Sequence, residues 1–191
     1  MAEKYQEIHQ KLIESSKSGN RKAQCKLYQL YSKAMYNICF RMMNNREEAE
    51  DMLQEAFSEI FLKLDSFRYE SSFGAWVKRI VINKCINEMK RKKAELYFYD
   101  NLELLERRDA QEKEETPIDY QKIRFEVDSI HKAMQQLPDG YRIIFSLYLL
   151  EGYDHSEIAQ IMGISESTSK SQYMRAKVKI RDILKTMRYE G

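Results

Sequence analysis

The feature that most constrains this sequence is the helical spacing of its apolar residues, which continues along the chain with few interruptions. Apolar side chains recur every three or four residues, a period that lines one side of a helix. The first such stripe, which we expect to be buried, is Leu27, Leu30, Tyr31, Ala34, Met35 and Ile38. Only six glycines and two prolines occur among the 191 residues, and they punctuate the helical stretches instead of pervading them. Since no stretch is convincingly strand-like, the sequence predicts an all-α fold.

An acidic stretch divides the helical pattern into two parts. Between Glu95 and Asp119 the helical spacing is lost, and nine acidic residues occur with three basic ones. We therefore expect two small helical domains, over residues 1–93 and 125–191, joined by an acidic flexible linker over 94–124.

Positive charge is concentrated in two predicted helices. The net charge is only +2, but residues 78–93 and residues 170–188 each contain seven basic residues and one acidic residue. One such block is ordinarily a solvated helix face. Two basic helices with interleaved aromatic residues favour a nucleic-acid partner.

The last part of the chain has the pattern of a helix-turn-helix. Asp154 and the residues after it resemble a capped helix start, and Gly163-Ile164-Ser165 forms a tight turn before a long basic helix. Ile158, Ile161, Ile164, Tyr173 and Ala176 are expected to pack the two helices together. The side chains left to enter a DNA major groove are Glu166, Ser167, Lys170, Ser171, Met174 and Arg175. The alternative is an ordinary helical hairpin with a hydrated basic face.

The N-terminal part contains an acidic helix and an aromatic loop. Glu50, Asp51, Gln54 and Glu55 share one side of the helix that begins near Arg46 and form a surface suited to a basic partner helix. The simpler interpretation is that acidic residues near a helix N-terminus stabilise its dipole. The aromatic loop follows at residues 67–73 and leads into the basic helix, an arrangement suited to stacking unpaired bases.

Other classes of function find little support. The three cysteines, Cys25, Cys39 and Cys85, lack the spacing of a zinc site, and we interpret all three as core thiols. No reactive constellation or phosphate-binding glycine loop occurs, so neither an enzyme, a metal site nor a cofactor is expected. No apolar run approaches the roughly 18 residues that span a bilayer, and the first ten residues lack a signal-peptide pattern, so we expect a cytoplasmic protein.

Three blocks of this chain, in this order, resemble regions two and four of bacterial sigma factors. Residues 46–57 are similar to the core-polymerase-binding segment of region two, and residues 67–83 to its melting and minus-ten recognition segment. Residues 137–176 are similar to region four. The chain has no room between these blocks for the additional domain of larger sigma factors, so it resembles the extracytoplasmic-function (ECF) group.

The resemblance implies a transcription initiation factor that binds RNA polymerase core and directs it to promoters. Glu50, Asp51, Gln54 and Glu55 would contact the clamp helices of the largest polymerase subunit, and the flap would be a second contact. The minus-ten element would be melted and held by Phe67, Arg68, Tyr69, Glu70, Ser71, Ser72, Arg79 and Asn83. The minus-thirty-five element would dock on Glu166, Ser167, Lys170, Ser171, Met174 and Arg175. An anti-sigma factor is a further implied partner.

Two positions of the helix-turn-helix depart from the family pattern. Ser169 stands where valine is common, which predicts looser packing or a hydrogen bond back to the preceding turn. Gln172 stands where arginine is common and removes one charge that could reach a phosphate. Two alternatives remain at this point: a helix-turn-helix regulator that does not depend on core polymerase, and an adaptor that binds polymerase without reading DNA.

Overall fold

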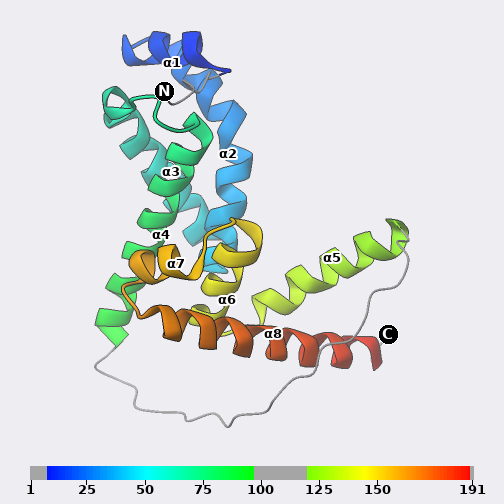
Figure 1. Ribbon diagram of the computed structural model, residues 1–191. Coiled ribbons are helices and arrows are strands. Elements are labelled where there is room, and N and C mark those ends of the chain that lie inside the picture. The colour runs from blue at the N-terminus through cyan, green and yellow to red at the C-terminus, as the bar shows by residue number, and fades with distance from the viewer. Residues whose placement is uncertain (1–7, 97–119, 190–191) are drawn as a thin grey trace, which may run out of the picture. The chain divides into compact units, whose positions relative to one another are not determined.

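The structure is a computed structural model that describes residues 8–96 and 120–189. These residues form helices and no strand (Figure 1), which confirms the all-α prediction. The chain divides into two units, residues 1–95 and 96–191. The linker predicted over 94–124 lies mostly outside the described residues. At its edges α4 continues to Leu96 and α5 already begins at Tyr120, so the helices extend into the predicted linker from both sides.

The described part of unit 1 contains four α-helices whose ends are set by local sequence. They are α1 (Gln10–Lys17), α2 (Arg21–Met43), α3 (Arg46–Leu62) and α4 (Phe73–Leu96), with a 3-10 turn η1 (Leu64–Ser66) after α3. The Asn20 side chain accepts hydrogen bonds from the first amides of α2, and Asn45 does the same for α3. Asn44, in the left-handed conformation at φ 54°, ends α2. The predicted break at Asn44-Asn45 is therefore confirmed.

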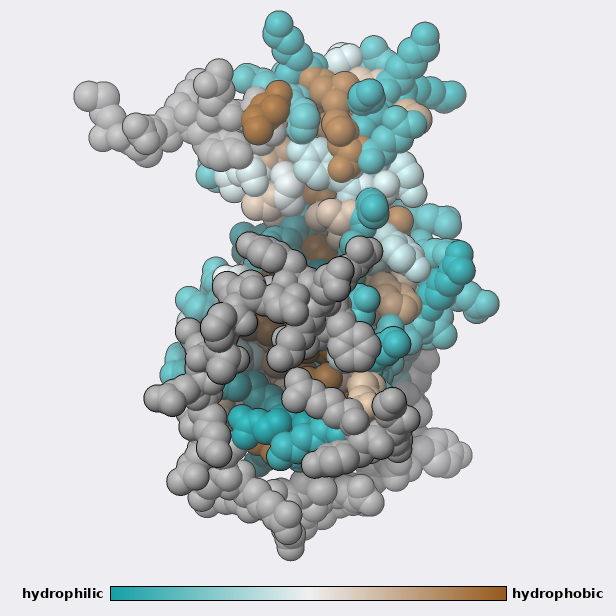
Figure 2. All heavy atoms as spheres, turned by 90° about the vertical axis from the view of Figure 1, so that its right-hand side faces the viewer, coloured by the Kyte–Doolittle hydropathy of each residue, from teal (hydrophilic) through white to brown (hydrophobic). Residues whose placement is uncertain are grey.

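The core of unit 1 lies between α2, α3 and α4, while α1 lies across one end of α2 (Figure 1). The buried side of α2 includes Cys39, Met42 and Met43 in the last turns of the helix. Leu30, 46% exposed, and Ala34 lie at the edge of this stripe, so the prediction that both are buried is wrong. At the α1 end of the unit, hydrophobic side chains occupy small areas among hydrophilic ones (Figure 2).

The cysteines also divide between core and surface. Cys39 and Cys85 are buried, as predicted, and a side-chain hydrogen bond between them, together with burial, raises the pKa of the Cys85 thiol. Cys25 is exposed, which contradicts its interpretation as a core thiol. It lies near the start of α2, on the side of this helix that faces away from Leu27.

Unit 2 is organised around its last helix. It consists of α5 (Tyr120–Gln135), α6 (Asp139–Phe145), a π-helical turn η2 (Ser146–Leu150), α7 (His155–Met162) and α8 (Glu166–Tyr189), and α8 packs against α5, α6 and α7. Its core includes Ala133, Met134, Leu137, Phe145, Ala176 and Ile180. In the turn between α5 and α6, the buried Arg142 guanidinium donates to the Leu137 carbonyl and pairs with Asp139. Arg142 therefore stabilises this turn.

Within the described residues, no helix is both long enough and apolar enough to cross a membrane.

Candidate functional site

The acidic side of α3 is open to solvent. Glu50, Asp51, Gln54 and Glu55 are all accessible, whereas Leu53, Phe57 and Ile60 on the opposite side are buried. Because α3 begins directly at Arg46 after its Asn45 cap, the acidic residues fall in its first three turns. The structure thus brings the four predicted polymerase-binding side chains onto one accessible surface.

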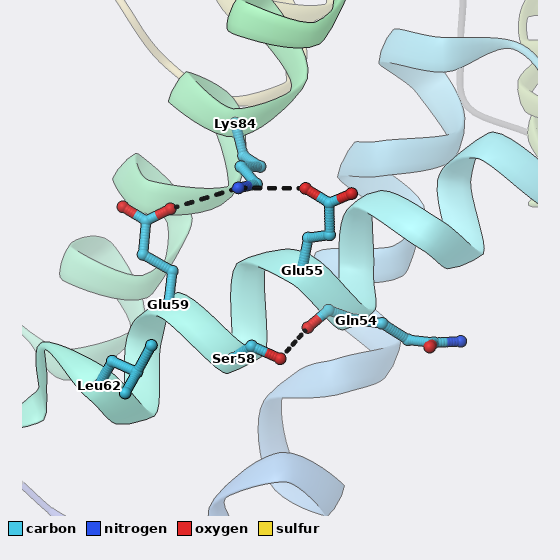
Figure 3. A pocket seen from close by; sticks show the side chains of 6 residues that line it. All are labelled: Gln54, Glu55, Ser58, Glu59, Leu62 and Lys84. Carbon is cyan, nitrogen blue, oxygen red and sulfur yellow. Dashed lines mark hydrogen bonds and ion pairs between the residues drawn. The ribbon is translucent and has the colours of Figure 1, made fainter.

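A shallow groove between α3 and α4 borders this acidic surface (Figure 3). It is lined by Gln54, Glu55, Ser58, Glu59, Leu62 and Lys84. In Figure 3 the amine of Lys84 lies between two carboxylates of α3, at 3.1 Å from Glu55 and 3.7 Å from Glu59. The hydrogen bond to Glu55 is the main cause that raises the pKa of Lys84. Leu62, at the end of the groove, is 85% exposed, an unusual position for a large apolar side chain.

The sequence analysis missed Lys84 and Leu62. Lys84 was assigned only to a basic helix, and its pairing partners lie about 25 to 30 positions away in the chain, on another helix. Lys84 fixes Glu55 against α4, while Asp51 has no ion pair within the described part of the chain. Asp51 and Glu55, two members of the predicted polymerase-binding set, therefore differ in their freedom to meet a partner.

The loop between η1 and α4 presents a smaller set of side chains than predicted. Phe67 is only 3% exposed, and its ring packs against the rings of Phe73 and Trp76 at centroid distances of 5.3 and 5.4 Å. In this conformation the Phe67 ring is covered and offers a base no open face to stack on. Phe67 instead supports the loop from beneath.

The remaining loop residues have two kinds of environment. Arg68, Glu70 and Ser71 are exposed, whereas Tyr69 and Ser72 are half-buried. The Ser72 hydroxyl accepts a hydrogen bond from the Ala75 amide at 3.1 Å and so caps the start of α4. Further along α4, Arg79 and Asn83 are exposed and lie one turn apart on the same side of the helix. Arg68, Glu70, Ser71, Arg79 and Asn83 are thus the accessible members of the predicted minus-ten set.

The helix-turn-helix of unit 2 is present as predicted. Asp154 accepts from the Glu157 amide and the Glu157 side chain accepts from the Asp154 amide, which forms a capping box at the start of α7. Gly163 ends α7 at φ 72°, a left-handed conformation that favours glycine, and its amide donates to the Ala159 carbonyl. The Ser165 hydroxyl then accepts from the Thr168 amide and caps α8.

The predicted DNA-reading residues share the outer surface of α8. All six are accessible: Glu166, Ser167, Lys170, Ser171, Met174 and Arg175. The Lys170 amine lies 2.6 Å from a Glu166 carboxylate oxygen, and this hydrogen bond raises the pKa of Lys170. A phosphate that binds Lys170 must therefore compete with Glu166 for the amine.

Ser169 makes a side-chain contact that could not be predicted from the sequence. It is completely buried, and its hydroxyl lies 2.9 Å from Nδ1 of His155, the first residue of α7. The prediction of a bond to the preceding turn is wrong for the side chain, because the partner lies on the other helix of the motif. The His155 ring also stacks on Tyr148 at 4.5 Å and meets Tyr173 edge-on at 5.6 Å. A polar contact inside an aromatic cluster thus joins α7 to α8.

We expect His155→Phe to destabilise unit 2 by about 1–3 kcal/mol, because the buried Ser169 hydroxyl loses its partner while the ring stacking is kept. The double variant His155→Phe with Ser169→Ala should recover most of this stability, since neither polar group remains. Native-state hydrogen exchange of the α8 amides measures the stability of both variants. Equal protection in the single variant and the wild type would show that the hydrogen bond contributes nothing to stability.

Comparison with known proteins gives both units a family. The profile of Sigma-70 region 2 matches residues 27–95, and that of Sigma-70 region 4 matches residues 128–180. The RNA polymerase sigma-H factor of Pseudomonas aeruginosa is 29% identical over 191 residues, which cover 97% of this chain and 98% of the relative. The ECF RNA polymerase sigma factor SigW of Bacillus subtilis is 27% identical over 93% of this chain and 97% of its own length.

Solved structures share the fold. The sigma factor RpoE of Bartonella quintana, solved with the anti-sigma factor NepR, matches with a TM-score of 0.54 at 23% identity, covering 84% of this chain and 95% of its own. CnrH, solved with the cytosolic domain of CnrY, matches with a TM-score of 0.51 at 21% identity over 92% of this chain and 96% of its own. Regions 2 and 4 together match well over half of the chain, and they occur in the family's order. The chain therefore belongs to the ECF group of the sigma-70 family.

Proposed function

We propose that this chain binds RNA polymerase core and directs it to specific promoters, melting the minus-ten element with unit 1 and docking the minus-thirty-five element with unit 2. The observation that carries this proposal is the presence of both sigma regions in one chain, each with its expected surface exposed. A helix-turn-helix regulator that does not depend on polymerase would leave the region 2 match unexplained. An adaptor that does not read DNA would leave the exposed surface of α8 unused.

In this proposal the acidic side of α3 meets a basic surface of the core enzyme. Asp51, Glu50 and Gln54 are accessible and can contact a partner at little cost. The exposed Leu62 adds apolar area at the end of the neighbouring groove. Charged groups at the rim with an apolar contact beside them are typical of a specific protein interface.

Promoter melting would use the loop and the following helix of unit 1. Extruding a base from the duplex costs a few kcal/mol, which contacts in the protein must return. Arg68, Glu70 and Ser71 are accessible for those contacts, and Arg79 and Asn83 can hold the separated strand along α4. The rings of Phe67, Phe73 and Trp76 pack together at the base of this loop.

Unit 2 would bind the upstream duplex through α8. Lys170 and Arg175 supply positive charge for phosphates or guanine edges, and Met174, 50% exposed, can contact a thymine methyl. The His155–Ser169 contact fixes α7 against the helix that carries these side chains.

The chain is further proposed to act in the cytoplasm, without enzymatic activity of its own, and to be held inactive by an anti-sigma factor. Two solved relatives of the same fold are complexes, one with an anti-sigma factor and one with a cytosolic domain. Tyr148, Leu149 and Leu150 at η2 are 37–53% exposed and supply an apolar surface for a protein partner, either the polymerase flap or the anti-sigma factor.

Transcription in vitro tests the proposal directly. Bacterial core polymerase with the purified chain, supplied with a library of genomic promoters, should start transcription at a limited set of sites that core alone does not use. Transcripts that are the same with and without the chain would contradict the proposed function. The promoters found would also supply the elements for the experiments below.

We expect Lys170→Ala with Arg175→Ala to weaken binding of the full chain to upstream-element duplex by about tenfold or more. The slope of log affinity against log salt should become shallower by about one for each phosphate that the variant no longer neutralises. Fluorescence anisotropy across a salt series measures both quantities. Lys22→Ala with Lys26→Ala, a pair of exposed lysines on α2, removes the same charge from unit 1 and serves as the control. If the control variant lost as much affinity for the duplex, α8 would contribute only its charge and not a specific binding surface.

A further inference from the structure

The loop that precedes α4 is tied to α1 by a cluster of polar contacts. The Tyr69 hydroxyl donates to a Glu14 carboxylate oxygen at 2.5 Å, and the Lys17 amine donates to the Phe67 carbonyl at 3.1 Å. The same amine lies 3.2 Å from Glu14 and 5.0 Å from the centre of the Tyr69 ring. Two residues of α1 thus hold two residues of the loop, some fifty positions later in the chain.

The environment of Lys17 and Glu14 indicates a preformed contact. The Lys17 side chain is only 17% exposed, although a surface lysine ordinarily extends into water. Tyr69 and then Lys17 lower the pKa of Glu14, which keeps this carboxylate charged and able to accept. Lys11, six residues before Lys17 on α1, is exposed and makes no hydrogen bond or ion pair with the described residues.

The backbone of the loop needs such support. Tyr69 has φ 63°, in the left-handed region that residues other than glycine rarely adopt. This conformation turns the Tyr69 side chain toward α1 and leaves its neighbours Arg68 and Glu70 exposed. A strained residue persists only where its surroundings hold it, and such residues are concentrated at functional sites.

We propose that α1 is part of the minus-ten site: Glu14 and Lys17 are positioning residues that hold the loop in the conformation presenting Arg68, Glu70 and Ser71 to the extruded base. This inference rests on the proposed function of the loop and goes beyond it. The matched segment of region 2 begins at residue 27, so α1 lies outside the part of the chain that this family profile covers. Neither Glu14 nor Lys17 needs to touch DNA.

The test uses the chain assembled with core polymerase and a fork template carrying a fluorescent base analogue at the minus-ten position. Glu14→Ala and Lys17→Met should each raise the holoenzyme concentration needed for half of the extrusion signal by about 3- to 10-fold, since each removes a charge-assisted hydrogen bond. Affinity for core should stay within about twofold of the wild type. Lys11→Met, on the same helix, is the matched control and should behave as the wild type.

A conservative variant separates positioning from general stability. Glu14→Gln keeps an oxygen that can accept from Tyr69 and should restore part of the extrusion signal that Glu14→Ala removes. Wild-type extrusion in both Glu14→Ala and Lys17→Met would overturn the inference. So would decreases in extrusion and core affinity of equal size, because these would show that α1 only stabilises the unit.

A loop variant distinguishes failure of this inference from failure of the proposed function. Glu70→Ala with Ser71→Ala changes the exposed part of the loop and leaves the contacts to α1 in place. If this variant alters the extrusion signal and the α1 variants do not, the inference about α1 is wrong and the function of the loop stands. If the loop variant leaves the signal unchanged, the base-capture role fails, and the role of α1 fails with it.

Discussion

Reversing Asp51 and Glu55 to lysine should lower the affinity for RNA polymerase core by about a hundredfold or more. Each reversal sets a lysine against the polymerase surface, which is proposed to be basic. Like-charge contacts at an interface cost several kcal/mol. Both side chains are exposed, so the fold of unit 1 should be kept. Binding is measured by surface plasmon resonance on immobilised core.

The structure shows which of the two changes gives the clearer result. Glu55 pairs with Lys84, so its reversal also breaks a contact between α3 and α4 and sets two lysines side by side. Asp51→Lys alone disturbs no ion pair of the described residues and should already account for most of the decrease in affinity. Asp65→Lys, at an exposed position of η1, introduces the same charge away from α3 and is the control. Unchanged core binding by Asp51→Lys would mean that this side of α3 is not the polymerase-binding surface.

Truncating Phe73 to alanine should lower the free energy of unfolding of unit 1 by about 3–5 kcal/mol, the range for a fully buried aromatic residue. Phe73 is 1% exposed and packs edge-on against Tyr31 and Phe67, at centroid distances of 5.2 and 5.3 Å. A cavity at this position would open beneath the loop and the first turn of α4 together.

The single tryptophan of the chain makes this destabilisation measurable for one unit. The ring centroids of Trp76 and Phe73 are 5.7 Å apart. Because Trp76 is the only tryptophan and lies in unit 1, its fluorescence in a urea titration follows the unfolding of unit 1 and not that of unit 2. Leu62→Ala is the control: this side chain is 85% exposed, and its truncation should change the stability by less than about 0.5 kcal/mol. Equal midpoints for Phe73→Ala and the wild type would show that the aromatic cluster does not stabilise the unit.

Features that depend on neighbouring residues could be predicted from the sequence. The break at Asn44-Asn45, the capped start of α7 at Asp154 and the turn at Gly163 each rest on side-chain or backbone properties within a few positions. The exposed surfaces of α3 and α8 follow equally from helical periodicity once the buried side is known.

Features that depend on contacts between distant residues could not be predicted. The turn of Tyr69 toward α1 and the pairing of Lys84 with α3 both join segments whose spacing along the chain gives no signal. Arg68, Tyr69 and Glu70 are consecutive in the sequence, and nothing in their order assigns them different roles. Only the fold shows that Tyr69 holds the loop to α1 while Arg68 and Glu70 are exposed.

The unequal burial of the cysteines gives this chain a built-in attachment point for a probe. Cys39 and Cys85 are buried, and the raised pKa of Cys85 keeps its thiol protonated and unreactive, while Cys25 is exposed on α2. A maleimide dye added to the native protein should therefore label Cys25 selectively. With a second cysteine introduced at an exposed position of α8 for an acceptor dye, energy transfer in single molecules would follow how the two units separate or approach as the chain meets core polymerase and then a promoter.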